Sequence, residues 1–287
     1  MKHILRSAVL SAITALSAQS AMADVTVSGD YLKFGVGNNG ALIDFTTLTG
    51  LQFDPTGSGN FSGAPDFLTP GSPFAFYSIG VNGLYDTAQY GYNAFGSTTA
   101  SMSLAGTTYV ATSAGTFNGL KISQTMTFDT TTNILHTNVV LTNTTNHTLN
   151  NIAYGVGFDP DQDAAPYGNF STDNQILSQG VGGSVQAMGL GTGYVAKLSS
   201  TGGWSADAGV YWPWETNPYT LATAATVGSY SDSSIALGYN FGNLAKGKQI
   251  SIGYDLTISA VPEPETYAML LAGLGLIGVA ARRRRSA

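Results

Sequence analysis

Apolar and polar residues alternate with a period of two along several short stretches of this chain, which is the pattern of β-strands with one buried face. In residues 120–129, LKISQTMTFD, the apolar positions are Leu120, Ile122, Met126 and Phe128. Residues 250–258 repeat the pattern with Ile250, Ile252, Tyr254, Leu256 and Ile258, and residues 152–158 repeat it with Ile152, Tyr154, Val156 and Phe158. Residues 129–133, DTTTN, have the composition of a hairpin loop, so we expect residues 120–158 to form a three-stranded antiparallel meander.

Seven further stretches have the composition of short strands separated by turn-forming residues. They span residues 31–36, 74–81, 98–104, 107–111, 185–195, 210–214 and 235–241. The chain around them is rich in Gly, Thr, Ser and Asn, which favours strands joined by turns over helices. No fixed-period repeat is visible, which argues against a propeller or a β-helix. The sequence therefore predicts an all-β fold: an antiparallel β-sandwich or an enlarged two-sheet sandwich, with a barrel as the alternative and residues 54–73 as a long surface loop.

The first 23 residues have the layout of a secretory signal peptide. Lys2 and Arg6 give a positive start, residues 8–16 are apolar, and Ala21 and Ala23 supply the small residues of a cleavage site. The apolar stretch is too short to span a bilayer permanently. We therefore expect signal peptidase to cut after Ala23, so that the mature chain begins outside the cytoplasm.

The body between the two ends of the chain is strongly acidic. Residues 24–260 contain five lysines, no arginine, fourteen aspartates and one glutamate, which gives a net charge of −10. Because phosphate binding needs clustered Lys and Arg, this balance excludes a nucleic-acid-binding role, and it disfavours binding to anionic lipid. The chain has no cysteine, which excludes thiol catalysis, thiolate metal sites and disulfides, so its stability must come from core burial or bound ions.

The densest group of acids lies in the stretch GFDPDQDAAPYGNFSTDN. In an extended chain, Asp159, Asp161 and Asp163 would point to one side, where three carboxylates repel one another unless a cation joins them. Calcium prefers six to eight oxygen ligands, so these aspartates are candidate Ca²⁺ ligands, with Asn169 or Asp173 as possible helpers. The EF-hand pattern fails, because Ala164 stands at its glycine position and Phe170 at its bidentate glutamate position. The alternative is a solvated loop in which Asp and Pro supply turn chemistry.

An aromatic cluster surrounds a glutamate in the stretch VYWPWETNPY, residues 210–219. Exposed rings beside a carboxylate are suited to sugar binding, so Trp212, Trp214 and Glu215 are candidate glycan ligands. In a sandwich the same tryptophans more often fill the core, and that interpretation is the favoured one here. A glycosidase pair of Glu215 with Asp207 or with one of the three aspartates stays open, because sequence cannot give the separation of two carboxyl groups.

Little in the body points to catalysis. His136, on an expected strand, and His147, in an expected turn, are the only histidines of residues 24–260, and they lack the spacing of a zinc site. A nucleophile elbow and a phosphate-binding loop are absent from the sequence, and the many glycines of the body lie in strand-and-turn stretches, where turns and bulges explain them. We therefore expect a protein that is not an enzyme.

The C-terminal segment, residues 261–287, has three parts in order: a Pro-Glu-Pro stretch, a short apolar run and an arginine cluster. The run 267–281 holds fifteen uncharged residues, a helix of about 22 Å at about 1.5 Å per residue. A hydrocarbon core of about 30 Å normally needs about 20 residues, so the span is marginal. The cluster of Arg282, Arg283, Arg284 and Arg285 should stay cytoplasmic, which leaves the body outside. This charge pattern predicts a single C-terminal transmembrane helix rather than a last core helix.

With these three parts in order, and a signal peptide in front, the tail resembles the PEP-CTERM sorting signal of Gram-negative bacteria. Pro262, Glu263 and Pro264 match its Pro-Glu-Pro signature, and the two prolines keep the segment extended and accessible to a protease. The resemblance implies that an exosortase, a membrane transpeptidase-like cysteine enzyme, cuts near this signature and releases or transfers the body. The family is associated with exopolysaccharide production and with biofilm or floc formation. The body itself resembles no family.

The chain is therefore expected to divide into a signal peptide (1–23), an exported all-β domain (24–260) and a sorting signal (261–287). We expect an exported protein of a Gram-negative bacterium that is briefly anchored in the inner membrane and then lies at the cell surface or outside the cell. Its expected partners are signal peptidase, an exosortase, the membrane and extracellular polysaccharide. The alternative function is an exported carbohydrate-binding or carbohydrate-active protein that uses the Trp212 region.

Overall fold

The computed structural model describes residues 24–89, 91–92, 95, 99–223, 228 and 230–261. The expected signal peptide, the Pro-Glu-Pro signature, the apolar run 267–281 and the arginine cluster lie outside these residues. Within the described part of the chain, no helix has the length and apolar character needed to cross a membrane.

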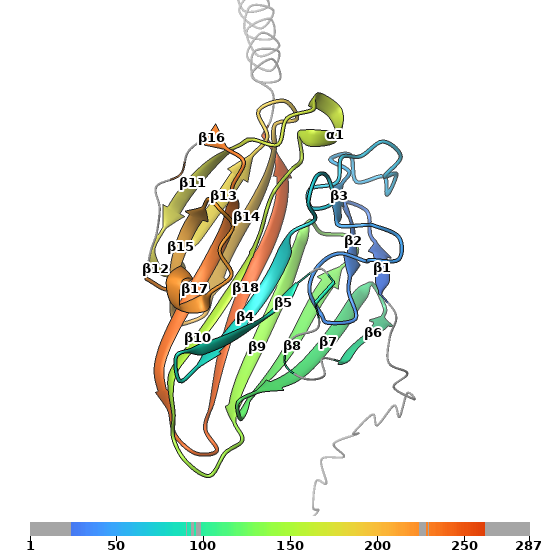
Figure 1. The fold of residues 1–287 in the computed structure, drawn as a ribbon. Coiled ribbons are helices and arrows are strands. Elements are labelled where there is room, and N and C mark those ends of the chain that lie inside the picture. Colours follow the sequence, from blue (N-terminus) through green and yellow to red (C-terminus); the bar gives the residue numbers. More distant parts are fainter. Residues whose placement is uncertain are drawn as a thin grey trace, which may run out of the picture.

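Two large antiparallel sheets face each other across the core (Figure 1). The six-stranded sheet has the spatial order β12 (Gly180–Val181), β15 (Ser205–Tyr211), β17 (Ser234–Leu244), β10 (Leu149–Phe158), β4 (Ala75–Val81) and β5 (Leu84–Gln89). The nine-stranded sheet has the order β16 (Tyr230–Ser231), β11 (Thr172–Ser178), β13 (Ser184–Met188), β14 (Tyr194–Thr201), β18 (Gln249–Ala260), β9 (Ile134–Asn143), β8 (Leu120–Asp129), β7 (Thr108–Phe117) and β6 (Thr99–Ala105). The predicted all-β, sandwich-like architecture is confirmed, in its enlarged form with two large sheets.

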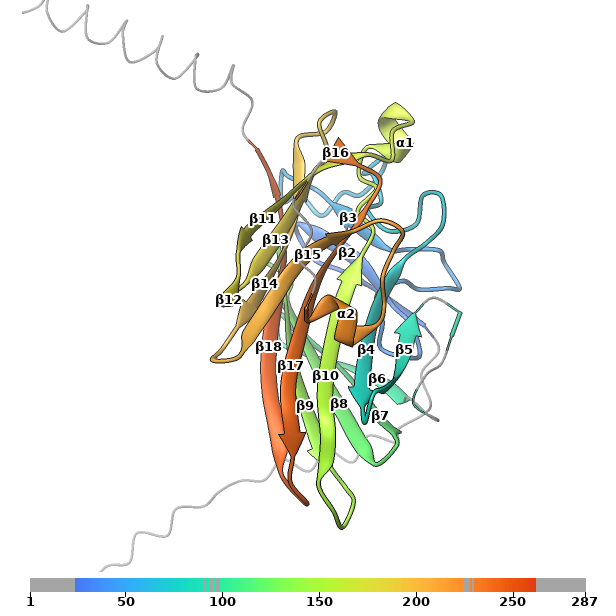
Figure 2. The same cartoon turned by 60° about the vertical axis from the view of Figure 1, so that its left-hand side comes forward.

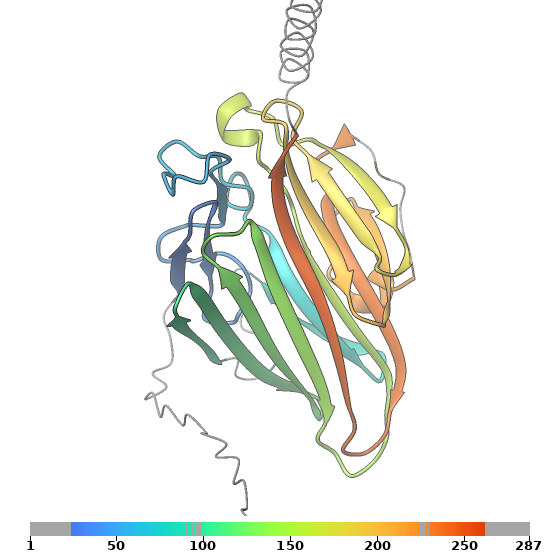
Figure 3. The same cartoon turned by 180° about the vertical axis from the view of Figure 1, so that it is seen from behind.

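A third, small sheet lies against the nine-stranded sheet near β6, β7 and β8, as the view from behind shows (Figure 3). Its strands are β1 (Val25–Ser28), β2 (Leu32–Val36) and β3 (Leu51–Phe53). The Phe34 ring of β2 meets the Phe128 ring of β8 edge-on, with ring centroids 5.1 Å apart. Both rings belong to the main hydrophobic core, so the N-terminal strands extend that core rather than forming a second domain.

Period-two alternation correctly located the strands that have one buried and one exposed face. In β18 all five predicted apolar positions are buried, whereas Gln249, Ser251 and Ala260 are exposed. In β8 the side chains of Leu120, Ile122 and Phe128 are almost completely buried. These two strands and β9 line one inner face of the sandwich.

The predicted meander of residues 120–158 is wrong in its third strand. β9 pairs with β8 and β18, whereas β10 crosses to the other sheet and pairs with β4 and β17. Burial explains the crossing, because every residue of β10 from Ile152 to Phe158 is buried. A strand covered on both faces belongs in the interior of a sheet with material on its outer side.

Three other sequence assignments also need correction. Residues 185–195 form two strands, β13 and β14, because the glycine-rich turn 189–193 intervenes. The strand expected at residues 210–214 ends at Tyr211, and Trp212 to Trp214 lie in the loop that follows. Residues 54–73 are not wholly a surface loop, since Phe67 and Leu68 are buried in the main core.

Two single-turn helices complete the described fold. Helix α1 (Ala164–Tyr167) follows β10, and helix α2 (Pro218–Leu221) lies on the outer face of the six-stranded sheet over β10 and β17 (Figure 2). Helix α2 covers the second hydrophobic cluster, in which Leu221 packs with Phe74, Phe76 and Tyr211. This cover explains why β10 is buried on both sides.

Candidate functional site

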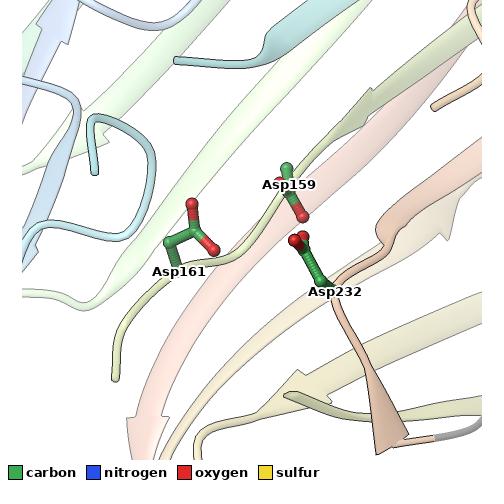
Figure 4. Close-up of side chains that lie close together, drawn as sticks. All are labelled: Asp159, Asp161 and Asp232. Carbon is green, nitrogen blue, oxygen red and sulfur yellow. The ribbon is translucent and has the colours of Figure 1, made fainter. Parts of the chain in front are cut away.

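Three aspartates from two separate stretches of the chain meet at the end of the sandwich that carries α1. Asp159 and Asp161 follow the last residue of β10, and Asp232 lies between β16 and β17. One carboxylate oxygen from each residue lies within 4.8 Å of the other two. In Figure 4 the carboxylates of Asp159 and Asp232 face each other, and Asp161 turns one oxygen toward them. We call these three residues the acidic cluster.

The backbone around the first two aspartates is fixed by hydrogen bonds from elsewhere in the fold. The Asp159 amide donates to the carbonyl of Phe74 at 3.0 Å, and the Asp161 amide donates to the carbonyl of Phe67 at 2.7 Å. The next residue, Gln162, donates its side-chain amide to the carbonyls of Ala187 and Tyr194. The fold itself therefore holds these two carboxylates near Asp232.

The oxygens of the acidic cluster are buried without hydrogen-bond partners. Asp159 is 2% exposed and Asp161 is 3% exposed. Both oxygens of Asp159, Oδ1 of Asp161 and Oδ1 of Asp232 are buried and accept no hydrogen bond. The only ion pair in the described part of the chain joins His136 to Asp255, so no basic side chain neutralises these carboxylates there. Buried charges are costly unless they are paired or bind a metal.

The electrostatics of the cluster follow from this arrangement. Burial, and next the neighbouring carboxylate of Asp232, raises the pKa of Asp159 to about 7. Burial, with Asp159 and Asp232 as further causes, raises the pKa of Asp161 to about 9. Burial also raises the pKa of Asp232. The cluster therefore takes up protons readily, and a multivalent cation is the other species that can offset its charge.

Asp163 lies apart from the acidic cluster, although the sequence spacing grouped it with Asp159 and Asp161. Its Oδ2 accepts the amide of Gly191 at 2.6 Å, and its Oδ1 accepts the amide and hydroxyl of Thr192 at 2.9 and 2.7 Å. The expectation of a common side assumed an extended chain. Asp163 instead has φ −95° and ψ −6° at the start of α1, so the alternation of strand side chains does not apply to it.

The two possible helpers of the predicted calcium site have other partners. The Asn169 side-chain amide donates to the Tyr230 hydroxyl at 2.6 Å, and Asp173 accepts a hydrogen bond from Gln175. The third member of the cluster, Asp232, went unnoticed because it stands in the stretch SDSS, which reads as an ordinary turn. Only the pairing of β16 with β11 and of β17 with β10 brings it next to Asp159.

The aromatic region separates into an exposed ring and a packed one. Trp212 is 69% exposed in the loop after β15. Trp214 stacks on Phe74 with ring centroids 4.7 Å apart, which places it at the edge of the second hydrophobic cluster. Oε1 of Glu215 accepts the amides of Thr216 and Asn217 at 2.9 and 2.7 Å. The role of these residues in glycan binding stays a prediction, with Trp212 as the ring available for stacking.

The histidines of the body occupy surface positions. His136 of β9 stands opposite Asp255 of β18, and its Nδ1 lies 2.7 Å from Oδ1 of Asp255. The His136 side chain is 54% exposed, so the contact is a cross-strand surface pair. His147 lies in the turn between β9 and β10, where its ring contacts Asn146.

The described residues of β18 end on the same side of the sandwich as the acidic cluster. Ala260 is the last residue of β18, and the amide of Val261 donates to the carbonyl of Gly193 at 2.8 Å. Residues 260–285 match the family model of the PEP-CTERM protein-sorting motif. The chain carries a PEP-CTERM sorting motif.

The PEP-CTERM motif confirms the resemblance of the C-terminal segment. It begins at the last residue of β18, so the sorting motif follows the sandwich without a spacer. It is the motif of exported proteins that an exosortase processes. A comparison with curated proteins finds no match for the chain.

Several solved structures are distantly similar to this chain. A polysaccharide lyase is 13% identical with a TM-score of 0.49, covering 83% of this chain and 33% of its own. A bacterial glucoamylase complexed with acarbose is 11% identical with a TM-score of 0.49, covering 87% and 34%. A galactose mutarotase related enzyme from Lactobacillus acidophilus is 11% identical with a TM-score of 0.39, covering 84% and 99%. The chain thus spans about a third of the length of the first two, and similarity at this level identifies neither a shared activity nor a shared ligand.

Proposed function

We propose that this protein is a non-catalytic component of the cell surface or extracellular matrix, processed at its C-terminus by an exosortase and working in an exopolysaccharide-rich biofilm. The observation that carries the proposal is the PEP-CTERM motif at residues 260–285. Because the motif starts where β18 ends, a cut within it leaves the sandwich complete. The acidic body, with a net charge of −10 in residues 24–260, suits a hydrated matrix better than a membrane surface.

The non-catalytic part of the proposal is supported by what the titratable groups contact. His136 is engaged with Asp255 on the surface, and Glu215 uses one oxygen to hold the backbone of its own loop. A nucleophile hydrogen-bonded to a base, and a base held by a third group, would favour catalysis. In the described residues, neither histidine ring has a serine or threonine hydroxyl among its hydrogen-bond partners. Thr145 bonds only to the backbone of His147.

Processing is tested with an epitope tag after Ala287 and an antiserum against the body. In a host with exosortase the mature protein should lose the tag and appear at the surface or in the medium. In an exosortase deletion strain the tag should remain. A Pro262→Ala/Glu263→Ala variant should also keep the tag, and it changes no residue of the sandwich. Retention of the tag in both strains would overturn the proposal.

The matrix role needs its own test. Deleting the gene should lower the mass of biofilm or floc, and the intact gene should restore it. Unchanged biofilm in the deletion strain contradicts the matrix role while leaving exosortase processing untouched.

The exposure of Trp212 favours carbohydrate binding as a second candidate function. A ring that is 69% exposed provides a stacking surface for a sugar, and Glu215, three residues later in the same loop, has a carboxylate that could accept a sugar hydroxyl. We expect glycan-array binding by the purified protein that Trp212→Ala abolishes and that Trp204→Ala, a change at a second partly exposed tryptophan, leaves intact. Hydrolysis of polysaccharide that is lost in Glu215→Ala would favour an enzyme instead. No glycan binding by the unchanged protein would end this candidate.

A further inference from the structure

We propose that Asp159, Asp161 and Asp232 form a calcium-binding site that joins two of the connections by which the chain crosses between the large sheets. The first crossing runs from β10 of the six-stranded sheet to β11 of the nine-stranded sheet, and it contains Asp159 and Asp161. The second runs from β16 back to β17, and it contains Asp232. This site concerns the stability of the exported body and is independent of the sorting and matrix roles.

The separation of the oxygens suits calcium. Calcium binds oxygen at about 2.3–2.6 Å, so two ligands on opposite sides of one ion are at most about 4.6–5.2 Å apart. One oxygen of each aspartate lies within 4.8 Å of the others, which satisfies that limit. Magnesium demands near-octahedral geometry and keeps several of its waters, so a group of protein carboxylates suits calcium better. Carboxylates alone, without histidine or cysteine, also favour a hard cation over zinc or copper.

The second observation that points to a ligand is the state of Asp159. Its side chain is 2% exposed, it accepts no hydrogen bond at either oxygen, and it faces Asp232 (Figure 4). Ionised carboxylates are acceptors only, so the three side chains can satisfy one another only by taking up protons, for which a cation would compete. A solvated acidic loop would place these oxygens in water. Their burial is instead what a coordinated ion requires.

The surroundings explain how the site is held and how it is completed. Backbone hydrogen bonds from Asp159 and Asp161 to Phe74 and Phe67 fix one side. Asp232 is only half-buried, so water can supply the remaining ligands that calcium needs beyond the carboxylates. An ion at this position would tie the two crossings together and would reinforce the contact between the sheets at this end.

Calcium binding is measured on the purified exported protein after treatment with EDTA. Titration with CaCl₂ in a calorimeter should show one site per chain, with a Kd of about 10⁻⁴ M, which lies in the range of extracellular calcium modules. At 5 mM CaCl₂ the ion would be in about fifty-fold excess over Kd, which should raise Tm by roughly 5–9 °C for a body of this size. MgCl₂ at the same concentration should give a smaller shift.

Substitutions of single aspartates show whether these side chains bind calcium or only support the fold. Asp161→Asn and Asp232→Asn should each weaken calcium binding at least ten-fold and abolish the rise in Tm. In EDTA both variants should melt no lower than the unchanged protein, because each removes one of three repelling carboxylates. Asp30→Asn makes the same charge change at an exposed site and should keep the full calcium response. Asp163→Asn should also keep it, since Asp163 bonds to Gly191 and Thr192 instead.

Two results would overturn the site itself, and a third would overturn its assignment to calcium. One is the absence of both calorimetric heat and a Tm shift up to 10 mM CaCl₂, a concentration about a hundred-fold above the expected Kd. The other is a calcium response that survives in Asp161→Asn and in Asp232→Asn. A magnesium response equal to the calcium response would refute the assignment to calcium.

Discussion

Replacing Asp163 by asparagine should destabilise the sandwich by about 3 kcal/mol, because three donors converge on one buried carboxylate. Asp163 is 0% exposed, and it accepts bonds of 2.6 to 2.9 Å from the amides of Gly191 and Thr192 and from the Thr192 hydroxyl. These bonds fix the turn between β13 and β14.

The size of this loss follows from the hydrogen bonds that an asparagine side chain can still accept at position 163. Asparagine retains one acceptor oxygen, which can serve the two Thr192 donors, while its NH₂ group then faces the Gly191 amide. The Gly191 amide loses a hydrogen bond to a charged acceptor, worth about 1.5–3 kcal/mol, and the new NH₂ group stands without a partner at a position that is 0% exposed. The two remaining bonds weaken to neutral ones, each by roughly 1 kcal/mol, and removal of a buried charge offsets part of the loss.

Thermal unfolding followed by circular dichroism measures this effect. A loss of about 3 kcal/mol corresponds to a fall in Tm of roughly 6–12 °C for a domain of 150–250 residues. Thr192→Ala removes the hydroxyl, which donates to Asp163 and also accepts the Tyr194 amide at 3.2 Å, and it should cost about 1–2 kcal/mol. The double variant should lose less than the sum of the two, because both changes affect the same bonds. A fall below about 2 °C for Asp163→Asn would show that the carboxylate does not hold the turn.

Three further predictions follow from single positions. Gly238→Ala should destabilise the protein by more than about 2 kcal/mol, because a Cβ there would collide with the backbone of Leu221 and Ala222 at the end of α2. Gly203→Ala is the control: its Cβ would meet nothing, so Tm should change little. Hydrogen bonds from Thr56 and Ser58 hold the pKa of Asp54 well below its usual range, so the carboxylate stabilises the fold above pH 4 and this contribution is lost as the pH falls. Asp54→Asn should therefore flatten the acid side of a curve of Tm against pH, and an unchanged curve would contradict this. Trp212→Ala should leave Tm nearly unchanged, because the ring is exposed. Trp214→Ala removes the stack on Phe74 and should lower Tm by several degrees. Equal effects of the two substitutions would refute the distinction between the rings.

The parts of the fold that could be predicted are those where one face of a strand meets the core and the other meets water. Strands β8 and β18 show this difference, and period-two alternation located both. Strand β10 alternates in sequence too, but its intervening Ala153, Gly155 and Gly157 are small residues that are also buried, and α2 covers Gly155. Alternation cannot reveal to which sheet such a strand belongs, since that depends on pairing between distant segments.

Two of the three residues of the acidic cluster could be predicted from the sequence, and the third could not, because it comes from a distant segment. The repeat of aspartates at Asp159 and Asp161 is local and visible in the sequence, and both carboxylates do reach one site. Asp163 was misplaced because α1 begins at that residue, and no strong helix signal accompanies the stretch AAPY. Asp232 stands 71 positions after Asp161, where only the sheet topology brings the two together.

The position of the acidic cluster connects the stability of the body to the place where its sorting motif begins. This chain has no cysteine, so it has no disulfide to restrain its crossings. A calcium ion shared by Asp161 and Asp232 would close a long loop of the chain, and closing a long loop removes much entropy from the unfolded state. Gln162 and Asp163, next to the cluster, hold the turn whose Gly193 carbonyl accepts the amide of Val261. The end of the sandwich that adjoins the PEP-CTERM motif is therefore the end that the proposed ion would brace, which would keep residues up to Ala260 folded while a protease acts on the segment beyond them.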